Sequence, residues 1–131
     1  MLIVERLTHG LYIPATTTQL NNIQSALKYH GIPKSKLVDI GSGDGRIVHL
    51  AAQNGYKAHG IELNPWLVLY SKYKSLTMGL SRMATFSRQD LWKTNFEQYD
   101  NVVIFGVEQM VCILEIQFLD FNIFAKIGHF A

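Results

Sequence analysis

The chain has 131 residues, a length that suits one domain with a core of its own. Apolar residues make up 48% and charged residues only 17%, which favours an α/β domain with buried parallel strands over a disordered chain. The net charge is +2, and no Lys/Arg cluster is dense enough to follow a phosphate backbone, so no nucleic-acid partner is predicted.

The cysteine and histidine content does not support an internal disulfide bond or a metal site. The single Cys112 can form no internal disulfide. The five histidines lack paired ligand spacing with each other or with Cys112, so no metal site is predicted. No stretch reaches the roughly 18 uninterrupted apolar residues of a membrane span, and residues 1–10 lack the features of a signal peptide. The sequence therefore predicts neither a transmembrane span nor a cleaved leader.

A helix over residues 17–30 is the first predicted element, preceded by a lead-in segment over residues 1–16. Leu20, Ile23 and Leu27 recur on one helical face, a Thr cap precedes them, and Gly and Pro follow. Residues 37–40 then form a short apolar run that is typical of a buried strand.

A glycine loop over residues 41–45 follows this strand and leads into a helix over residues 46–54. Residues 57–62 are predicted as the next strand. Pro65 suits the first position of a helix that runs to about residue 78. Further strands are predicted over residues 84–87 and 101–105. The alternation of strands and helices predicts a parallel sheet with right-handed crossovers.

Three aromatic residues in the helix that begins at Pro65 share one spacing. Trp66, Tyr70 and Tyr73 lie at i, i+4 and i+7, which predicts a packing face. A substrate role for Trp66 is the alternative.

The glycine loop is the motif that carries chemistry, and it has the form D-x-G-x-G-x-G from Asp39 through Gly41 and Gly43 to Gly45. Its third glycine comes one residue earlier than in the G-x-G-x-x-G loop that meets a dinucleotide pyrophosphate. S-adenosylmethionine has no phosphate, and it requires only that backbone pass close under its methionine and ribose. Asp39 is expected to face the cationic end of this cofactor, and the following helix N-terminus to favour its carboxylate. A simple strand-to-helix turn is the alternative.

Two further acidic residues follow predicted strands. Glu62 ends the second strand 21 positions after Gly41, where a doubly wound domain places the carboxylate that accepts the ribose hydroxyls. The alternative for Glu62 is a solvated surface carboxylate. Asp90 follows the third strand and is a candidate for the adenine amino group, with Leu91 and Trp92 walling the ring, although an Asp that caps a turn is an equal possibility.

Five separate blocks, in this order, resemble the small mitochondrial lysine methyltransferases that act on the c-subunit of ATP synthase and on the adenine nucleotide translocase. The blocks are Tyr12-Ile13-Pro14-Ala15-Thr16, residues 38–48, Glu62-Leu63-Asn64-Pro65-Trp66-Leu67-Val68, Asp90-Leu91-Trp92-Lys93 and residues 101–107. The resemblance covers residues 12–110, and the Pro14 and Ile104 blocks look closer to the enzyme of the ATP synthase c-subunit.

The resemblance implies a fold, a cofactor and a site. The fold is α/β, a Rossmann-like seven-β-strand (class I) methyltransferase fold, here expected to be C-terminally incomplete. S-adenosyl-L-methionine is the implied cofactor, and a lysine of a mitochondrial inner-membrane protein, the ATP synthase c-subunit, is the implied substrate. Location would be the mitochondrial inner membrane or matrix. No general base is assigned: Glu108 is a candidate, and the start of a divergent tail is the preferred interpretation of that residue. The cofactor-binding residues are expected to be Tyr12, Pro14, Thr16, Asp39, Gly41, Gly43, Glu62, Asp90 and Leu91.

The chain departs from the family pattern at both ends. Members have a hydrophobic N-terminal segment, which the lead-in of residues 1–16 does not provide. Glu108 replaces a family Pro, and an apolar tail over residues 111–131 follows the cofactor-binding domain of residues 17–110. These departures predict a truncated or alternatively spliced form. The competing functions are a non-catalytic cofactor-binding or interaction fragment and a nicotinamide-dependent oxidoreductase, the latter disfavoured by the loop spacing.

Overall fold

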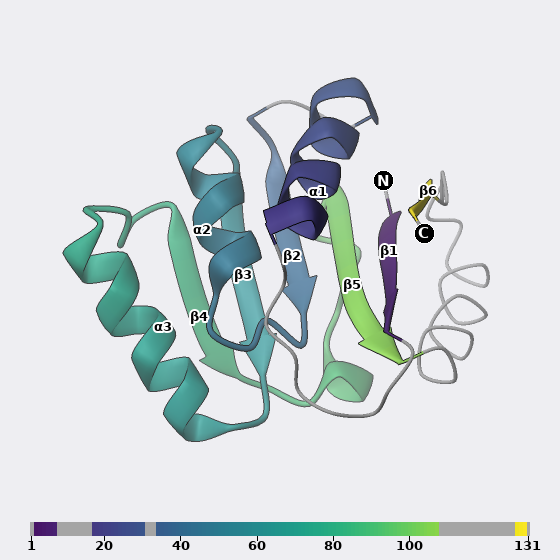
Figure 1. Cartoon of the computed structure of the whole chain (residues 1–131). Helices are drawn as coiled ribbons and strands as arrows, with labels where there is room; N and C mark the ends of the chain where they lie inside the picture. The colour runs from purple at the N-terminus through teal and green to yellow at the C-terminus, as the bar shows by residue number, and fades with distance from the viewer. Residues whose placement is uncertain (1, 8–16, 31–33, 108–127, 131) are drawn as a thin grey trace.

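The computed structural model describes residues 2–7, 17–30, 34–107 and 128–130 (Figure 1). The described strands are β1 (Leu2–Leu7), β2 (Lys36–Ile40), β3 (Lys57–Glu62), β4 (Ala84–Arg88), β5 (Asn101–Val107) and β6 (Gly128–Phe130). The described helices are α1 (Thr17–His30), α2 (Arg46–Gln53), α3 (Pro65–Thr77) and the short 3-10 helix η1 (Leu91–Lys93). All strand pairs are parallel, and the order across the six-stranded sheet is β4-β3-β2-β5-β1-β6.

The predicted elements of the central region are confirmed with small shifts at their ends. The helix over residues 17–30 and the strand over residues 57–62 have the predicted bounds, and the sheet is parallel as expected. Two strands were not predicted, β1 and β6. β1 lies between β5 and β6, with Leu2 in register with Val102. The chain therefore brings segments far apart in sequence together at one side of the sheet.

Helices α1, α2 and α3 all lie on the face of the sheet that is toward the viewer in Figure 1. This face holds a core in which α1 contributes Ile23 and Leu27, and α2 contributes Val48 and Ala51. These side chains recur at the three- and four-residue spacing of a helix, so each helix buries one stripe against the strands. The periodicity of the sequence thus identified the buried face of α1 correctly.

The opposite face of the sheet has its own core, with a different kind of cover. The strands contribute five fully buried side chains to it: Val38, Ile40, Ile61, Val102 and Ile104. Leu91, Phe96 and Tyr99 pack against them from η1 and the loop that follows it. β5 buries Val103 on one face and Val102 and Ile104 on the other, and its sequence is almost continuously apolar, as expected of a central parallel strand.

The buried face of α3 is not the one that the aromatic spacing predicted. Trp66, Tyr70 and Tyr73 are 75%, 49% and 63% exposed, so the predicted packing face points to solvent. The helix instead buries Val68, Ser71 and Ser75 against the rest of the domain. Small serine side chains let α3 approach its neighbours closely, so the helix buries its serine face and not its aromatic face.

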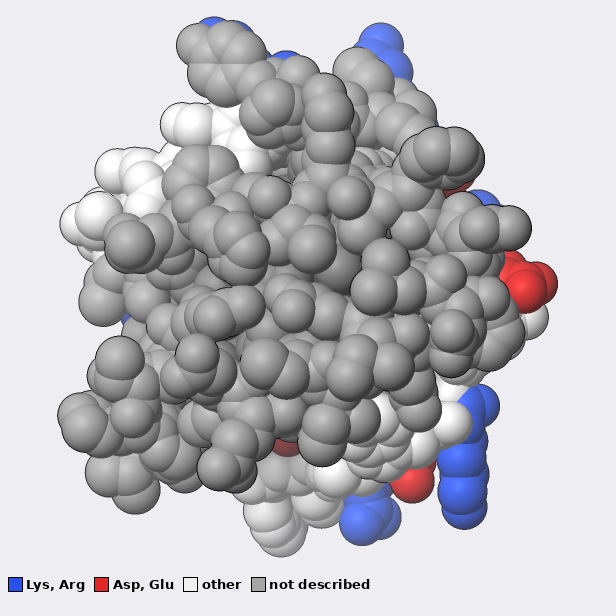
Figure 2. All heavy atoms as spheres, turned by 90° about the vertical axis from the view of Figure 1, so that its right-hand side faces the viewer, with Lys and Arg blue, Asp and Glu red and all other residues white. Residues whose placement is uncertain are grey.

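Figure 2 shows the molecule from the side on which β1 and β6 lie, and the described Lys and Arg side chains stand near its outline with Asp and Glu between them. Among the described helices, none is both long and apolar enough to cross a membrane. Within the same ranges, no three His, Cys, Asp or Glu side chains gather in a way that could hold a metal ion.

Candidate cofactor-binding site

The candidate site lies at the carboxyl ends of β2 and β3, which run side by side with Ile40 in register with Ile61. The glycine loop leaves β2 at this point. The backbone N–H groups of Gly41 and Ser42 both donate to the carbonyl oxygen of Ile61, at 2.9 and 3.0 Å. The loop is therefore tied to the end of the neighbouring strand, which is where open parallel sheets bind ligands.

Glu62, the last residue of β3, bridges the two strand ends through its carboxylate. Oε2 accepts a hydrogen bond from the backbone N–H of Gly43 at 3.0 Å, and Oε1 accepts from the N–H groups of Leu63 and Asn64 at 3.1 and 3.2 Å. Hydrogen bonds to an ionised acceptor are stronger than neutral ones. The half-buried carboxylate is thus held at the loop, where the ribose acceptor was predicted.

The three glycines of the loop all have left-handed backbone angles, with φ of 72° at Gly41, 56° at Gly43 and 85° at Gly45. A Cβ at Gly41 would meet nothing within 4 Å, so the space above this residue is open to a ligand. A Cβ at Gly45 would lie 2.7 Å from Cζ of Phe86. The glycines thus differ in their surroundings: Gly41 has open space beside its backbone, and Gly45 lets the loop pack on β4.

Asp39 places an unpaired carboxyl group under the loop. The residue is 1% exposed, and neither carboxyl oxygen has a hydrogen-bond partner within the described part of the chain. Burial raises the pKa of Asp39 well above its usual range, and the nearby carboxylates of Glu62 and Asp44 raise it further. A buried acceptor without a partner costs stability, so it is expected to serve a ligand. The positive end of S-adenosylmethionine fits this need.

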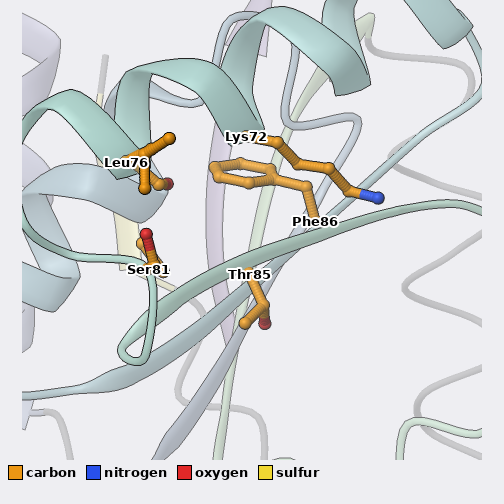
Figure 3. A pocket seen from close by; sticks show the side chains of 7 residues that line it. Lys72, Leu76, Ser81, Thr85 and Phe86 are labelled. Carbon is orange, nitrogen blue, oxygen red and sulfur yellow. The ribbon is translucent and has the colours of Figure 1, made fainter.

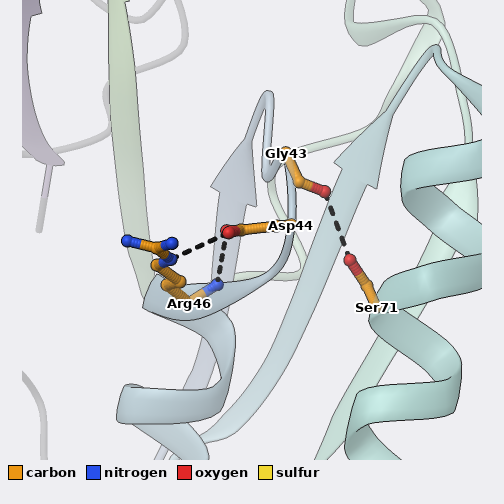
Figure 4. A network of polar contacts seen from close by, with 4 residues as sticks. All are labelled: Gly43, Asp44, Arg46 and Ser71. Carbon is orange, nitrogen blue, oxygen red and sulfur yellow. Dashed lines mark hydrogen bonds and ion pairs between the residues drawn. The ribbon is translucent and has the colours of Figure 1, made fainter. Parts of the chain in front are cut away.

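The N-terminus of α2 already has a negative partner, which bears on the choice of cofactor (Figure 4). Asp44 approaches the backbone N–H of Arg46 at 3.4 Å, and its other oxygen pairs with Nε of Arg46 at 2.8 Å. A pyrophosphate would have to compete with this carboxylate for the helix end. The arrangement therefore disfavours a dinucleotide, and it also argues against the predicted role of this helix end in binding the carboxylate of the cofactor.

Two buried serines of α3 were not predicted as part of the site, and one of them holds the loop from the helix side. The Ser71 hydroxyl donates to the carbonyl oxygen of Gly43 at 3.2 Å (Figure 4), and Ser75 Oγ is 2.9 Å from Nε2 of His49 in α2. Burial lowers the pKa of His49, which favours the neutral form of its ring. The spacing of Ser71 and Ser75, four residues apart in an apolar helix, was the only sequence signal for this contact.

We expect the Ser71→Ala variant to lose about 1 kcal/mol of unfolding free energy and to bind cofactor about five- to tenfold more weakly, because the buried carbonyl of Gly43 loses its donor. Urea unfolding and calorimetric titration measure the two effects. Ser75→Ala is the matched control, since its hydroxyl contacts His49 and not the loop. Equal losses of affinity in both variants would contradict a specific role for Ser71.

A recess of about 160 Å³ opens beside the loop, lined by Ile40, Gly41, Ile61, Glu62, Leu63, Gln89 and Leu91. Leu91, which was predicted to contact the adenine ring, lines this recess. Gln89 also lines it and was not predicted. Trp92 does not line this recess and is 49% exposed. Oδ1 of Asp90 accepts a hydrogen bond from the N–H of Trp92 at 3.0 Å, which is the capping role considered as the alternative. A role in adenine recognition stays a prediction.

Three predicted site residues, Tyr12, Pro14 and Thr16, lie outside the described residues, as does Glu108. The structure thus brings together Asp39, Gly41, Gly43, Glu62 and Leu91 of the predicted set.

Solved structures of methyltransferases share this architecture. An RNA methyltransferase from Salinibacter ruber, in complex with S-adenosyl-L-homocysteine, matches with a TM-score of 0.73 and 22% identity over 88% of this chain and 72% of that one. A SAM-dependent methyltransferase from Thiobacillus denitrificans, also in complex with S-adenosyl-L-homocysteine, matches with a TM-score of 0.62 and 22% identity, covering 78% of this chain and 41% of that one. The fold is the Rossmann-like, class I methyltransferase fold.

The family follows from closer matches. The chain belongs to the ANTKMT methyltransferase domain family, whose model matches residues 39–120. The human ATP synthase c-subunit lysine N-methyltransferase is 53% identical over 104 residues, covering 79% of this chain and 43% of that protein. The mouse adenine nucleotide translocase lysine N-methyltransferase is 41% identical over 105 residues, covering 79% of this chain and 44% of that protein. The chain thus spans less than half the length of these two relatives.

Proposed function

We propose that the chain binds S-adenosylmethionine and acts as a protein-lysine N-methyltransferase. The observation that carries this proposal is the meeting of the glycine loop with two carboxyl groups: Glu62 contacts the N–H of Gly43 at 3.0 Å, and Asp39 lies buried and unpaired beside it. One carboxylate suits ribose hydroxyls and the other suits a cationic group. Such a pair is what a nucleoside that also carries positive charge requires.

The residues of the chain would act mainly by holding and orienting their ligands. When bound, S-adenosylmethionine would supply a methyl group on a sulfonium, from which an in-line nucleophile takes the methyl carbon and leaves the neutral thioether, S-adenosylhomocysteine. Gly41 would let the backbone pass close to the cofactor, Glu62 would accept from the ribose, and Asp39 would face the positive end. Alignment of this kind contributes several kcal/mol to such reactions. The substrate lysine must arrive as the neutral amine, and a desolvated site would lower its pKa from about 10.4.

The c-subunit of ATP synthase is the substrate that we favour. The support is the name of the human relative, an ATP synthase c-subunit lysine N-methyltransferase at 53% identity, against 41% for the mouse enzyme named for the adenine nucleotide translocase. The same names support a mitochondrial location, at the inner membrane or in the matrix. We assign no general base, because Glu62 is the one titratable side chain among the described residues that line the recess, and its oxygens accept from N–H groups of the backbone.

The experiment that tests cofactor binding is calorimetric titration of S-adenosylmethionine into the 131-residue chain. We expect micromolar binding that falls at least about 100-fold in Glu62→Ala, because hydrogen bonds to a charged group contribute about 1.5 to 3 kcal/mol each. Glu97→Ala, which removes an exposed carboxylate away from the recess, is the matched control. Binding of NAD in place of S-adenosylmethionine would overturn the proposal.

A methylation assay on the ATP synthase c-subunit then separates an enzyme from a fragment that only binds cofactor. Transfer of a labelled methyl group to a lysine of that protein, lost in Glu62→Ala, is the expected result. Cofactor binding without transfer to the c-subunit or to the adenine nucleotide translocase would favour the non-catalytic alternative.

A further inference from the structure

An exposed apolar stripe runs along the outer side of α3. Its members are 49% to 75% exposed, and they recur at i, i+3, i+4, i+7 and i+10: Trp66, Leu69, Tyr70, Tyr73 and Leu76. We call these five residues the α3 stripe. They lie opposite the buried Val68, Ser71 and Ser75, so the helix has its largest apolar side chains on the solvent side. Apolar surface gathered in this way marks an interaction site more often than scattered exposed residues do.

Basic residues flank the α3 stripe, and acidic residues are missing from this part of the sequence. By the 3.6-residue repeat of the helix, Lys72 lies along one border of the stripe and Lys74 along the other. From Leu63 to Gln89 the sequence contains no Asp or Glu, although it includes Arg82 and Arg88 as well as the two lysines. No ion pair joins Lys72 or Lys74 to an acidic group of the described ranges.

The apolar surface continues from the helix onto the edge of the sheet. A groove of about 360 Å³ separates α3 from the edge strand β4, and Lys72 and Leu76 line it together with the ring of Phe86 (Figure 3). Figure 3 shows the Lys72 side chain extended past this ring, with its ammonium group at the far end. A long stem on apolar surface with the charge held outward is the arrangement by which lysine borders a lipid-facing region.

We propose that the α3 stripe docks the domain on an anionic lipid bilayer. Helices that lie in the plane of a membrane interface have an apolar face with Trp, Phe or Leu and flanking Lys or Arg, and anionic lipids attract them. Trp and Tyr are favoured at the level of the headgroups. A second copy of the chain fits less well, because a twofold contact through the stripe would bring its bordering lysines close to each other.

The position of the stripe relative to the site has a consequence for substrates. α3 begins at Pro65, shortly after Glu62, so the Trp66 end of the stripe adjoins the carboxyl ends of the strands, where the cofactor recess opens. Docking through the stripe would hold that recess near the bilayer surface. The docking itself does not depend on methyl transfer, and it is tested without cofactor.

Co-sedimentation of the 131-residue chain with lipid vesicles tests the proposal. We expect the chain to bind vesicles of phosphatidylcholine with about one third phosphatidylglycerol, and to bind pure phosphatidylcholine at least about tenfold more weakly. In the Trp92→Phe variant, Trp66 is the remaining one of the two tryptophans. Its emission is expected to shift to shorter wavelength on binding. Sedimentation without this shift would mean that another surface binds the lipid, and would overturn the proposal.

Two variants and a control locate the surface. Leu69→Ser with Tyr73→Ser is expected to lower the vesicle partition coefficient at least about tenfold, because two large apolar side chains leave the interface. Lys72→Gln with Lys74→Gln should remove the preference for anionic vesicles. Met78→Ser changes an exposed apolar residue outside the stripe and should bind as the parent chain does. Parent-like binding by the first variant, or dimers at the ultracentrifuge in place of vesicle binding, would overturn the proposal.

Discussion

Replacing Asp39 by Asn is expected to raise the free energy of unfolding by about 1 to 3 kcal/mol at pH 7 while abolishing cofactor binding. The Asp39 carboxyl group is buried and has no partner among the described residues, and ionising such a group costs at least about 1 to 3 kcal/mol. An amide of the same shape removes the need to bury a charge. Urea unfolding measures the stability, and calorimetric titration with S-adenosylmethionine measures the affinity.

The pH dependence of this gain tests its cause. Burial raises the pKa of Asp39 in the folded state, so the folded protein binds this proton more tightly than the unfolded chain does. The stability that comes from the protonated carboxyl group is complete below the unfolded pKa of about 3.9. It is lost as the pH rises toward the folded pKa. The advantage of Asp39→Asn should therefore be small near pH 4 and grow toward neutrality, and a difference that is constant with pH would contradict this account.

Replacing Gly45 by Ala is expected to cost about 2 to 5 kcal/mol of unfolding free energy. The backbone at this position has φ of 85°, where a side chain costs about 1 to 2 kcal/mol. The new Cβ would also lie 2.7 Å from Cζ of Phe86, and such overpacking adds about 1 to 3 kcal/mol. Chemical denaturation of the two chains measures the difference.

Gly79→Ala separates the two causes, because Gly79 has φ of 69° but a Cβ there would meet nothing within 4 Å. This control should lose only about 1 to 2 kcal/mol, the backbone cost alone. A second control, Gly45→Ala combined with Phe86→Leu, should lose less than the sum of the two single changes, since the clash is relieved. Equal losses in Gly45→Ala and Gly79→Ala would show that the contact with Phe86 does not matter.

Local sequence patterns predicted the elements that form by local rules. The sequence around residues 17–30 has a Thr before the helix, an apolar stripe within it, and Gly31 and Pro33 after it, and the predicted bounds were correct. β1 was missed because residues 2–7 contain Glu5 and Arg6 and have no nearby partner strand. Its partner, β5, begins only at Asn101. Pairing between strands so far apart in the sequence cannot be predicted from the local pattern of residues.

The residues of the candidate site also fall into two groups, those that local sequence patterns could predict and those that depend on tertiary packing. Gly41, Gly43 and Glu62 could be predicted because a loop of fixed spacing and a strand end determine where they lie. Ser71 could not, because a serine within a helix has no typical partner until the packing of that helix is known. The outward face of α3 was predicted wrongly for a related reason. A run of aromatic residues at helical spacing looks the same whether it packs against a core or against something outside the domain.

The place of β1 in the sheet also has a consequence for the order of folding. β1 pairs with residues about one hundred positions later in the chain, so it leaves the ribosome long before its partner strand exists. The neighbouring units of β2, α2, β3, α3 and β4 form contacts over much shorter distances and are expected to assemble first. Until β1 arrives, one side of β5 is an unpaired strand edge that could recruit a strand from another chain.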